Sequence, residues 1–84
     1  MPRTLGTIVA ENLRRIREQK KWSQHDLAGF AGLDKNTPGN IERQNNSPTL
    51  ETLERLALTL GVDPLALFQD IAEQDDAVAE PDES

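Results

Sequence analysis

The stretch QHDLAGFAGLDKNTPGNI, residues 24–41, decides the fold of this chain. Its first half has the pattern of a short helix, with the small Ala28 in its interior and Gly32 four positions further on. Its second half predicts another short helix, which ends near the apolar Ile41. A small residue inside the first helix and a glycine in the turn allow two helices to cross closely at a steep angle. This spacing is typical of a helix-turn-helix, although an ordinary pair of helices in a small bundle has a similar pattern.

The first of these two helices has recognisable signals at both ends. Ser23 can accept a hydrogen bond from the amide of Asp26, which sits in the first turn, where the helix dipole favours a carboxylate. Trp22 and Leu27 are spaced for a hydrophobic staple across this cap. Gly32 stops the helix because glycine adopts the left-handed conformation at little steric cost. The side chains expected to carry its apolar face are Leu27, Ala28, Phe30 and Ala31.

A proline disturbs the pattern of the second helix. Asp34 is a capping residue type, which predicts a helix from about Lys35 to about Arg43. Pro38 has no amide for the first intrahelical bond, and it pushes Thr37 away from helical angles. A start with Thr37 as the cap and Pro38 in the first helical position resolves this conflict and leaves a helix of about two turns.

Three more helices are predicted around this pair, because their apolar residues recur at intervals of three and four. One covers residues 5–21, one is capped by Thr49 and ended by Gly61, and a fifth starts at Asp63 with Pro64 and continues to residue 71. Their core-facing residues are expected to be Leu5, Ile8, Val9, Leu13 and Ile16, then Leu50, Leu53, Leu56, Ala57 and Leu60, and finally Leu65, Leu67, Phe68 and Ile71. No segment alternates with a period of two, so the predicted fold is all-α with five helices and no sheet.

The composition excludes several classes of function. The 84 residues are 36% hydrophobic and 4% aromatic, which suits one small domain with a modest core. The chain has no cysteine and a single histidine, so we expect no disulfide, no metal, no cofactor and no enzyme activity. Its apolar stretches are far shorter than the ~20 residues of a membrane span, which predicts a cytoplasmic protein without a membrane partner.

Charge is distributed unevenly along the chain. Residues 1–43 carry eight basic and five acidic residues, whereas residues 44–84 carry one basic and ten acidic residues, for a net charge of −6. Seven of those acids lie within residues 70–84, which contain no base. We therefore expect one domain over residues 1–72 and an acidic, disordered tail over residues 73–84. Such a tail can also compete with phosphate for the basic part of the chain.

The sequence from about Asn12 to Phe68 resembles the Cro and phage-repressor type of helix-turn-helix regulators. The stretches that match, in order, are LRRIREQKKWSQHDLA, AGLDK and IERQNNSPTLETLERLALTLGVDPLALF. Among these regulators, the arrangement LDK-T---IER-N-SPTLETL is most similar to the small controller proteins of restriction-modification systems. The resemblance implies a five-helix, lambda-repressor-like domain that regulates transcription by binding a palindromic operator in double-stranded DNA as a homodimer.

The resemblance also implies roles for individual residues. The base-reading positions are Lys35, Asn36, Thr37 and Asn40. An asparagine can pair with the donor and acceptor on an adenine edge, and a lysine can donate to guanine. The positions that would hold backbone phosphates are Gln24, Lys20, Lys21, Arg43, Gln44 and Asn45. Arg17 and Glu42 match a pair whose ion bridge joins the first helix to the end of the recognition helix, the alternative being two solvated surface charges.

The sequence departs from this family at Pro38 and Gly39, where relatives carry a larger apolar residue and then a small polar one. One interpretation is that the reading helix begins late, so that Lys35 and Asn36 lie on a loop before it. The other is that Gly39 lets the backbone approach DNA closely. The departure also favours a rival function, a protein-binding module that keeps the fold without operator recognition.

The last predicted helix contains a candidate surface for self-association. Leu65 falls where relatives usually carry a polar residue. With Leu67 and Ile71 it can supply an apolar patch for a second copy of the chain, while core burial is the simpler account of Leu67.

Overall fold

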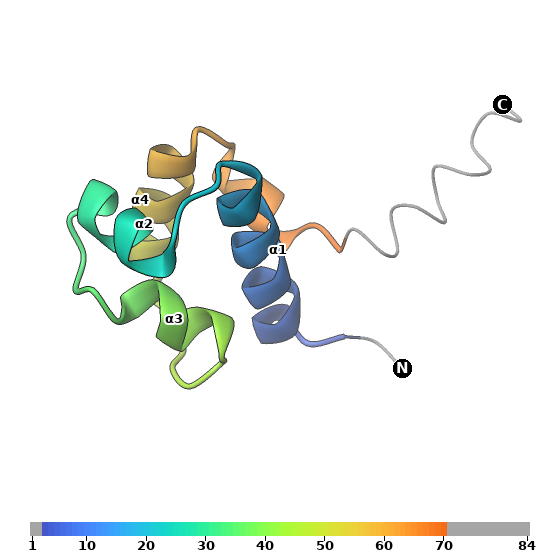
Figure 1. The fold of residues 1–84 in the computed structure, drawn as a ribbon. Coiled ribbons are helices and arrows are strands. Elements are labelled where there is room, and N and C mark those ends of the chain that lie inside the picture. The colour runs from blue at the N-terminus through green and yellow to red at the C-terminus, as the bar shows by residue number, and fades with distance from the viewer. Residues whose placement is uncertain (1–2, 71–84) are drawn as a thin grey trace, which may run out of the picture.

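A computed structural model describes residues 3–70 of the chain. This part folds into four α-helices and one short 3-10 helix around a single core, with no strand (Figure 1). The elements are α1 (Leu5–Gln19), α2 (Gln24–Ala31), α3 (Thr37–Glu42), α4 (Leu50–Leu60) and η1 (Pro64–Phe68). The predicted all-helical class is confirmed.

Some predictions concern residues beyond this part. Those for Ile71, for the acidic tail over residues 73–84 and for the domain boundary after residue 72 lie outside the described residues. Within residues 3–70, no helix combines the length and the apolarity needed to cross a membrane.

The prediction of a fifth α-helix is wrong. The chain instead forms the 3-10 helix η1, and its backbone is extended again at Gln69. The start of η1 is as predicted: Asp63 accepts a hydrogen bond from the amide of Leu65 at 2.8 Å, and Pro64 is the first residue of the turn.

A buried asparagine on α1 explains why η1 is short. Asn12 is 3% exposed, and its Nδ2 donates to the carbonyls of Ala66, Leu67 and Gln69 at 3.3, 2.9 and 2.7 Å. In a continuing α-helix, the carbonyls of Ala66 and Leu67 would accept from amides four residues later. Because Asn12 donates to these carbonyls, their hydrogen bonds do not require the helix to continue.

Most other helix ends follow their capping residues. The Ser23 hydroxyl accepts from the Asp26 amide and the Asp26 carboxylate accepts from the Ser23 amide, both at 2.9 Å, which completes a capping box. Thr49 caps α4 in the predicted way. Gly32 and Gly61 end α2 and α4 with φ of 71° and 76°, in the left-handed region that favours glycine.

The helix that follows Gly32 starts late. The first residue of α3 is Thr37, Pro38 is the second, and Asn36 caps the helix without a side-chain hydrogen bond. The start near Lys35 is therefore wrong, and the alternative with Thr37 as the cap is wrong by one residue. The Thr37 amide donates to the Asp34 carbonyl at 2.9 Å, which closes a turn and brings Asn36 to helical angles before the helix begins.

The core is made by α1, α2, α4 and η1 together with Ile41 of α3, and its fully buried leucines are Leu13, Leu27, Leu56, Leu60 and Leu67. Three residues expected to face it, Leu5, Phe30 and Leu50, are instead 61%, 62% and 74% exposed. Leu5 and Leu50 are the first residues of their helices, which extend past the core. Phe30 lies at the core margin against Trp22, with ring centres 4.7 Å apart.

One carboxylate holds α1, α2 and α3 together. Arg17 Nε and Nη2 donate to the two oxygens of Glu42 at 2.8 and 3.0 Å, and Gln24 Nε2 donates to Glu42 Oε1 at 3.0 Å. Arg17 also donates to the carbonyl of Trp22 at 2.7 Å. The Arg17 and Glu42 side chains are only 10% and 5% exposed, so this is not a solvated surface pair. The hydrogen bonds to Glu42 raise the pKa of Arg17 above its ordinary value, which keeps its guanidinium charged.

Replacing Asn12 with alanine tests its role at the end of η1. The substitution leaves buried carbonyls without a donor, so we expect the free energy of unfolding to fall by about 2 kcal/mol in urea titrations. The matched control is Asn46→Ala, in the exposed loop after α3, which we expect to change stability by less than about 0.5 kcal/mol. Equal stability of the two variants would contradict this role.

Removing one partner of the buried ion pair tests how α3 is held. Glu42→Ala leaves Arg17 charged and without its carboxylate, so we expect a loss of about 3 kcal/mol in the free energy of unfolding. The double variant Arg17→Met/Glu42→Leu removes both charges and is expected to recover most of that loss. A loss below about 0.5 kcal/mol in Glu42→Ala, the range of exposed pairs, would show that the contact does not anchor the helix.

Candidate nucleic-acid interface

The outer face of α3 carries amide and guanidinium side chains. Asn36, Asn40 and Arg43 follow one another at intervals of four and three residues, which places them on one side of the helix. Pro38 and Ile41 point the other way and are buried in the fold. This side of α3 therefore presents hydrogen-bonding groups to solvent, as contacts to base edges in a major groove require.

The four predicted base-reading residues are not all placed alike. Asn36 is exposed and Asn40 is partly exposed on the outer face of α3. Thr37 is half-buried at the first position of the helix, and Lys35 is exposed in the turn that precedes it. The structure thus brings the two asparagines together and leaves Lys35 ahead of the helix.

Gln24 stands where α2 meets α3. It is the first residue of α2 and is half-buried, because its side chain is bound to Glu42. The first intrahelical bond of α2 is donated by the Leu27 amide to Ser23, so the backbone amides of Gln24 and His25 precede it. These amides can bind an anion, whereas the Gln24 side chain is already engaged.

The remaining predicted phosphate ligands lie in the turns on either side. Lys20 and Lys21 are exposed between α1 and α2, and Lys21 has a φ of 62°. Gln44 is exposed just after α3, with its side-chain oxygen accepting from the Thr7 hydroxyl at 3.2 Å. Asn45 is exposed at the next position.

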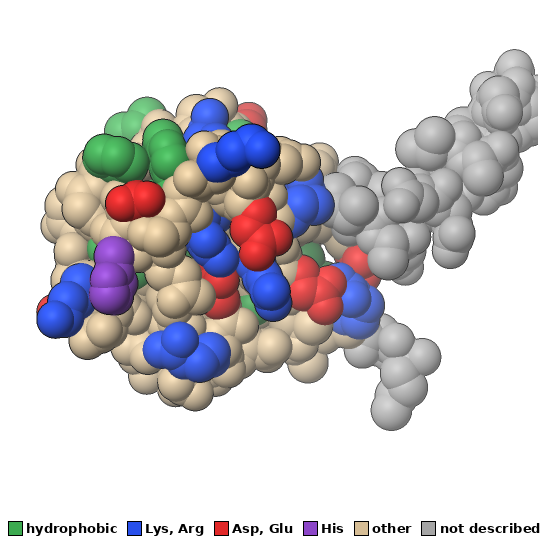
Figure 2. Space-filling view, in the orientation of Figure 1, with side chains coloured by type: hydrophobic (Ala, Val, Ile, Leu, Met, Phe, Trp, Pro, Cys, Tyr) green, Lys and Arg blue, Asp and Glu red, His purple; other side chains and the backbone are tan. Residues whose placement is uncertain are grey.

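Basic side chains gather on the side of the molecule formed by α1, α2 and α3, with carboxylates between them (Figure 2). Several arginines are paired: Arg14 contacts Glu18 at 3.1 Å, and Arg3 contacts Asp70 at 3.0 Å. The cations of the predicted interface that form no ion pair within residues 3–70 are Lys20, Lys21, Lys35 and Arg43. The basic groups left available for a polyanion therefore flank α2 and α3.

Gly39 is covered by two side chains. The residue is buried, and a Cβ atom added to it would lie 2.8 Å from Gln24 Oε1 and 2.9 Å from Arg43 Nη1. Both side chains cover the glycine, which does not favour the interpretation of close backbone approach, and that interpretation stays a prediction. The other interpretation, a late start of the reading helix, agrees with the structure.

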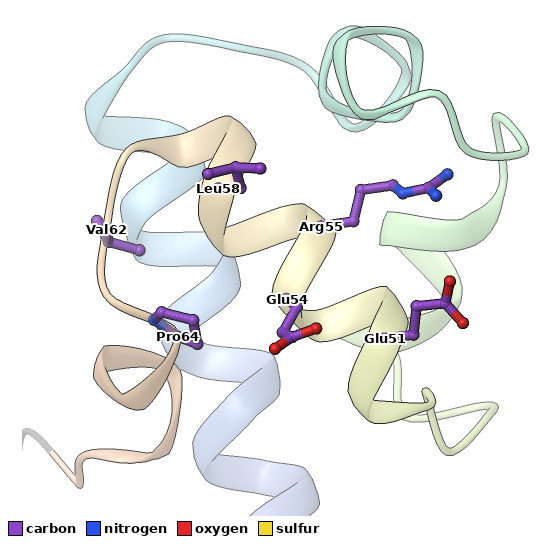
Figure 3. Close-up of a pocket in the computed structure, with 6 residues that line it drawn as sticks. All are labelled: Glu51, Glu54, Arg55, Leu58, Val62 and Pro64. Atoms are coloured by element: carbon purple, nitrogen blue, oxygen red, sulfur yellow. The ribbon is translucent and has the colours of Figure 1, made fainter.

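A groove on another side of the molecule was not predicted from the sequence. It has a volume of about 390 Å³ and lies on α4 and the turn into η1, lined by Glu51, Glu54, Arg55, Leu58, Val62 and Pro64 (Figure 3). Leu58 is 81% exposed at its edge, and the adjoining Leu65 is 69% exposed. The signal in the sequence was Leu58 itself, an apolar residue outside the core stripe of α4.

Solved structures of other proteins share this arrangement. A hypothetical transcription factor from Neisseria is 32% identical with a TM-score of 0.85, and the match covers 92% of this chain and 91% of that one. The nucleoprotein complex of C.Esp1396I, a restriction-modification controller protein, is 30% identical with a TM-score of 0.70, over 80% of this chain and 87% of that one.

Sequence comparison gives the same result. The HTH-type transcriptional regulator SutR of Escherichia coli is 38% identical over 64 residues, which are 76% of this chain and 35% of SutR. The chain thus spans about a third of the length of that curated relative. Residues 13–67, which include α2, the turn and α3, match the family described as helix-turn-helix. The chain belongs to this helix-turn-helix family.

Proposed function

We propose that this chain is a DNA-binding transcription regulator that binds a palindromic operator as a homodimer, with α3 of each copy in the major groove. The observation that carries the proposal is the outer face of α3. It presents Asn36 and Asn40 to solvent, and the Arg17–Glu42 pair holds the helix rigidly from behind. The transcriptional regulators among its relatives support the same function.

Base reading is assigned to Asn36 and Asn40, with Thr37 at the start of the helix and Lys35 in the turn before it. The outer position of the two asparagines supports this assignment, since amide groups match donor and acceptor patterns on base edges. Lys35 is long enough to reach a base or a phosphate from the turn.

Phosphate binding is assigned to Lys20, Lys21, Gln44 and Asn45 and to the start of α2. For Gln24 we assign the contact to the backbone amide, because its side chain is bound to Glu42. These residues lie on both sides of α3, so they would fix the position of the helix along a duplex without selecting sequence.

We assign the contact between the two copies of the dimer to the groove on α4 and η1. Two exposed leucines, Leu58 and Leu65, provide apolar contact area there, and Arg55 lies beside Glu51 and Glu54, a charge pattern that suits a symmetric contact. The patch predicted from Leu65, Leu67 and Ile71 needs a correction, because Leu67 is fully buried in the core. Since α3 packs against α1 and α2, a contact on this groove leaves the outer face of α3 free.

Selection from a pool of random DNA tests the proposed function. We expect the full chain to enrich a palindromic motif whose half-sites lie about 10 base pairs apart. Asn40→Ala is expected to lose selectivity within each half-site and to keep its affinity for random DNA. Lys20→Ala/Lys21→Ala is expected to weaken binding to all sequences. It should also lower the slope of log affinity against log salt concentration by about two, because two phosphate contacts are lost. If the folded, dimeric protein enriches no motif at low salt, the protein-binding module is the correct function.

Charge placed in the groove tests the proposed dimer. Because Leu58 and Leu65 are exposed, Leu58→Glu/Leu65→Glu is expected to leave the fold intact and to convert a dimer into a monomer in sedimentation equilibrium. The control is Phe30→Glu, at an apolar residue on α2 that is also largely exposed, and this variant is expected to stay dimeric. A dimer that survives the double substitution but is lost in Phe30→Glu would place the interface elsewhere.

A further inference from the structure

The guanidinium of Arg43 rests on the backbone of Gly39. Its Nη1 and Nη2 lie 2.9 and 3.2 Å from the point where a Cβ atom at residue 39 would be, and Gln24 Oε1 lies 2.8 Å from the same point. A side chain at residue 39 would therefore displace the ends of the Arg43 and Gln24 side chains. Gly39 lowers the helix propensity of α3, and its missing side chain leaves space for the Arg43 guanidinium beside the outer face of the helix.

In this position over Gly39, the Arg43 guanidinium is hydrogen-bonded to Asn40. Its Nη2 donates to Asn40 Oδ1 at 3.2 Å, which occupies an acceptor of the amide. Asn40 Oδ1 keeps one of its two lone pairs, and the other groups at the outer edge of the pair, the Nδ2 hydrogens of Asn40 and the remaining guanidinium hydrogens of Arg43, are donors. The pair therefore differs from a free asparagine, which presents one acceptor and one donor side by side.

We propose that the side chains of Asn40 and Arg43, which meet next to Gly39, bind guanine in the major groove as one unit. This inference rests on the proposed function, since it names the base that α3 reads. Guanine presents two acceptors, N7 and O6, in the major groove, whereas adenine presents one acceptor and one donor. A surface with more donors than acceptors matches guanine better than adenine, and the planar fork of Arg43 can donate to both guanine acceptors. The adenine contact predicted for Asn40 and the phosphate contact predicted for Arg43 are replaced by this shared contact.

The charge of Arg43 supports this assignment. The side chain is exposed and has no carboxylate partner within residues 3–70, so its guanidinium is available to an acceptor on DNA. Two parallel donors in a fixed plane fit the two guanine acceptors in a bidentate contact. The hydrogen bond to Asn40 and the contact with Gly39 restrict the side chain before binding, which lowers the entropy cost of forming that contact.

The test uses the full chain and the operator half-site obtained by selection. Each guanine is replaced in turn by 7-deazaguanine, which lacks the N7 acceptor, and by adenine. Three proteins are compared: the unaltered chain and the variants Gly39→Ala and Arg43→Lys. Gly39→Ala fills the space that the Arg43 guanidinium occupies, and Arg43→Lys keeps the charge without the planar fork. The matched control is Gly29→Ala on α2, an exposed helical glycine where an added Cβ meets nothing within 4 Å.

We expect at least one guanine per half-site at which 7-deazaguanine weakens binding of the unaltered chain about tenfold, as for loss of a bidentate base contact. Arg43→Lys should lose this discrimination while binding random DNA within about twofold of the unaltered chain, because the charge is kept. Gly39→Ala is also expected to lose the discrimination, but its Cβ atom meets Gln24 Oε1 as well, so Arg43→Lys is the variant that isolates the arginine. Gly29→Ala should retain the discrimination. Circular dichroism of each variant establishes that the fold is kept.

Two results would overturn the inference, and they are distinguishable from a failure of the proposed function. If a motif is selected but no guanine in it responds to 7-deazaguanine, α3 reads other bases. If Gly39→Ala and Arg43→Lys weaken operator and random DNA equally, Arg43 holds a phosphate only. If no motif is selected at all, the proposed function fails and this inference fails with it.

Discussion

The orientation of α3 depends on one buried carboxylate. This helix has only six residues, contains a proline and a glycine, and lacks a side-chain cap, so it has little stability as an isolated segment. Glu42 at its end binds Arg17 of α1 and Gln24 of α2, and this links the helix to both of its neighbours. Because both side chains of the ion pair are almost fully buried, water does not weaken the contact as it would at the surface. Every proposed role of the outer face depends on this link.

Local signals in the sequence were sufficient to predict most helix ends. Ser23, Thr49, Gly32 and Gly61 act through hydrogen bonds or backbone angles within a few residues, so their effects do not depend on the rest of the fold. Pro38 was equally informative, since its missing amide excluded an early start of α3.

Features that depend on tertiary contacts could not be predicted in this way. The end of η1 is set by Asn12, which is more than fifty residues away in the sequence. The exposure of Leu5, Phe30 and Leu50 followed from where the core ends, which a periodic pattern does not reveal. The positions of Arg17 and Glu42 as partners came from a family resemblance alone, whereas their burial and their contact with Gln24 required coordinates.

The candidate site was predicted as a set of residues but not as an arrangement. Asn40 and Arg43 were assigned separate tasks. Their spacing of three residues places them on one side of the helix, but the sequence does not show that the guanidinium donates to the amide. Their contact exists because Gly39 leaves room for the guanidinium, so the residue that departs from the family pattern also reshapes the surface. The groove on α4 and η1 lies on different elements from the outer face of α3, so the proposed dimer contact and the proposed DNA contact can be altered independently.

Nuclear magnetic resonance of the ¹⁵N-labelled chain titrated with DNA tests the central claim most directly, because it reports on every amide at once. We predict that the largest shift changes on adding duplex DNA fall at residues 36–45 and 20–25, with Leu58 and Leu65 unaffected. Shift changes centred on α4 and η1, with α3 unchanged, would contradict it.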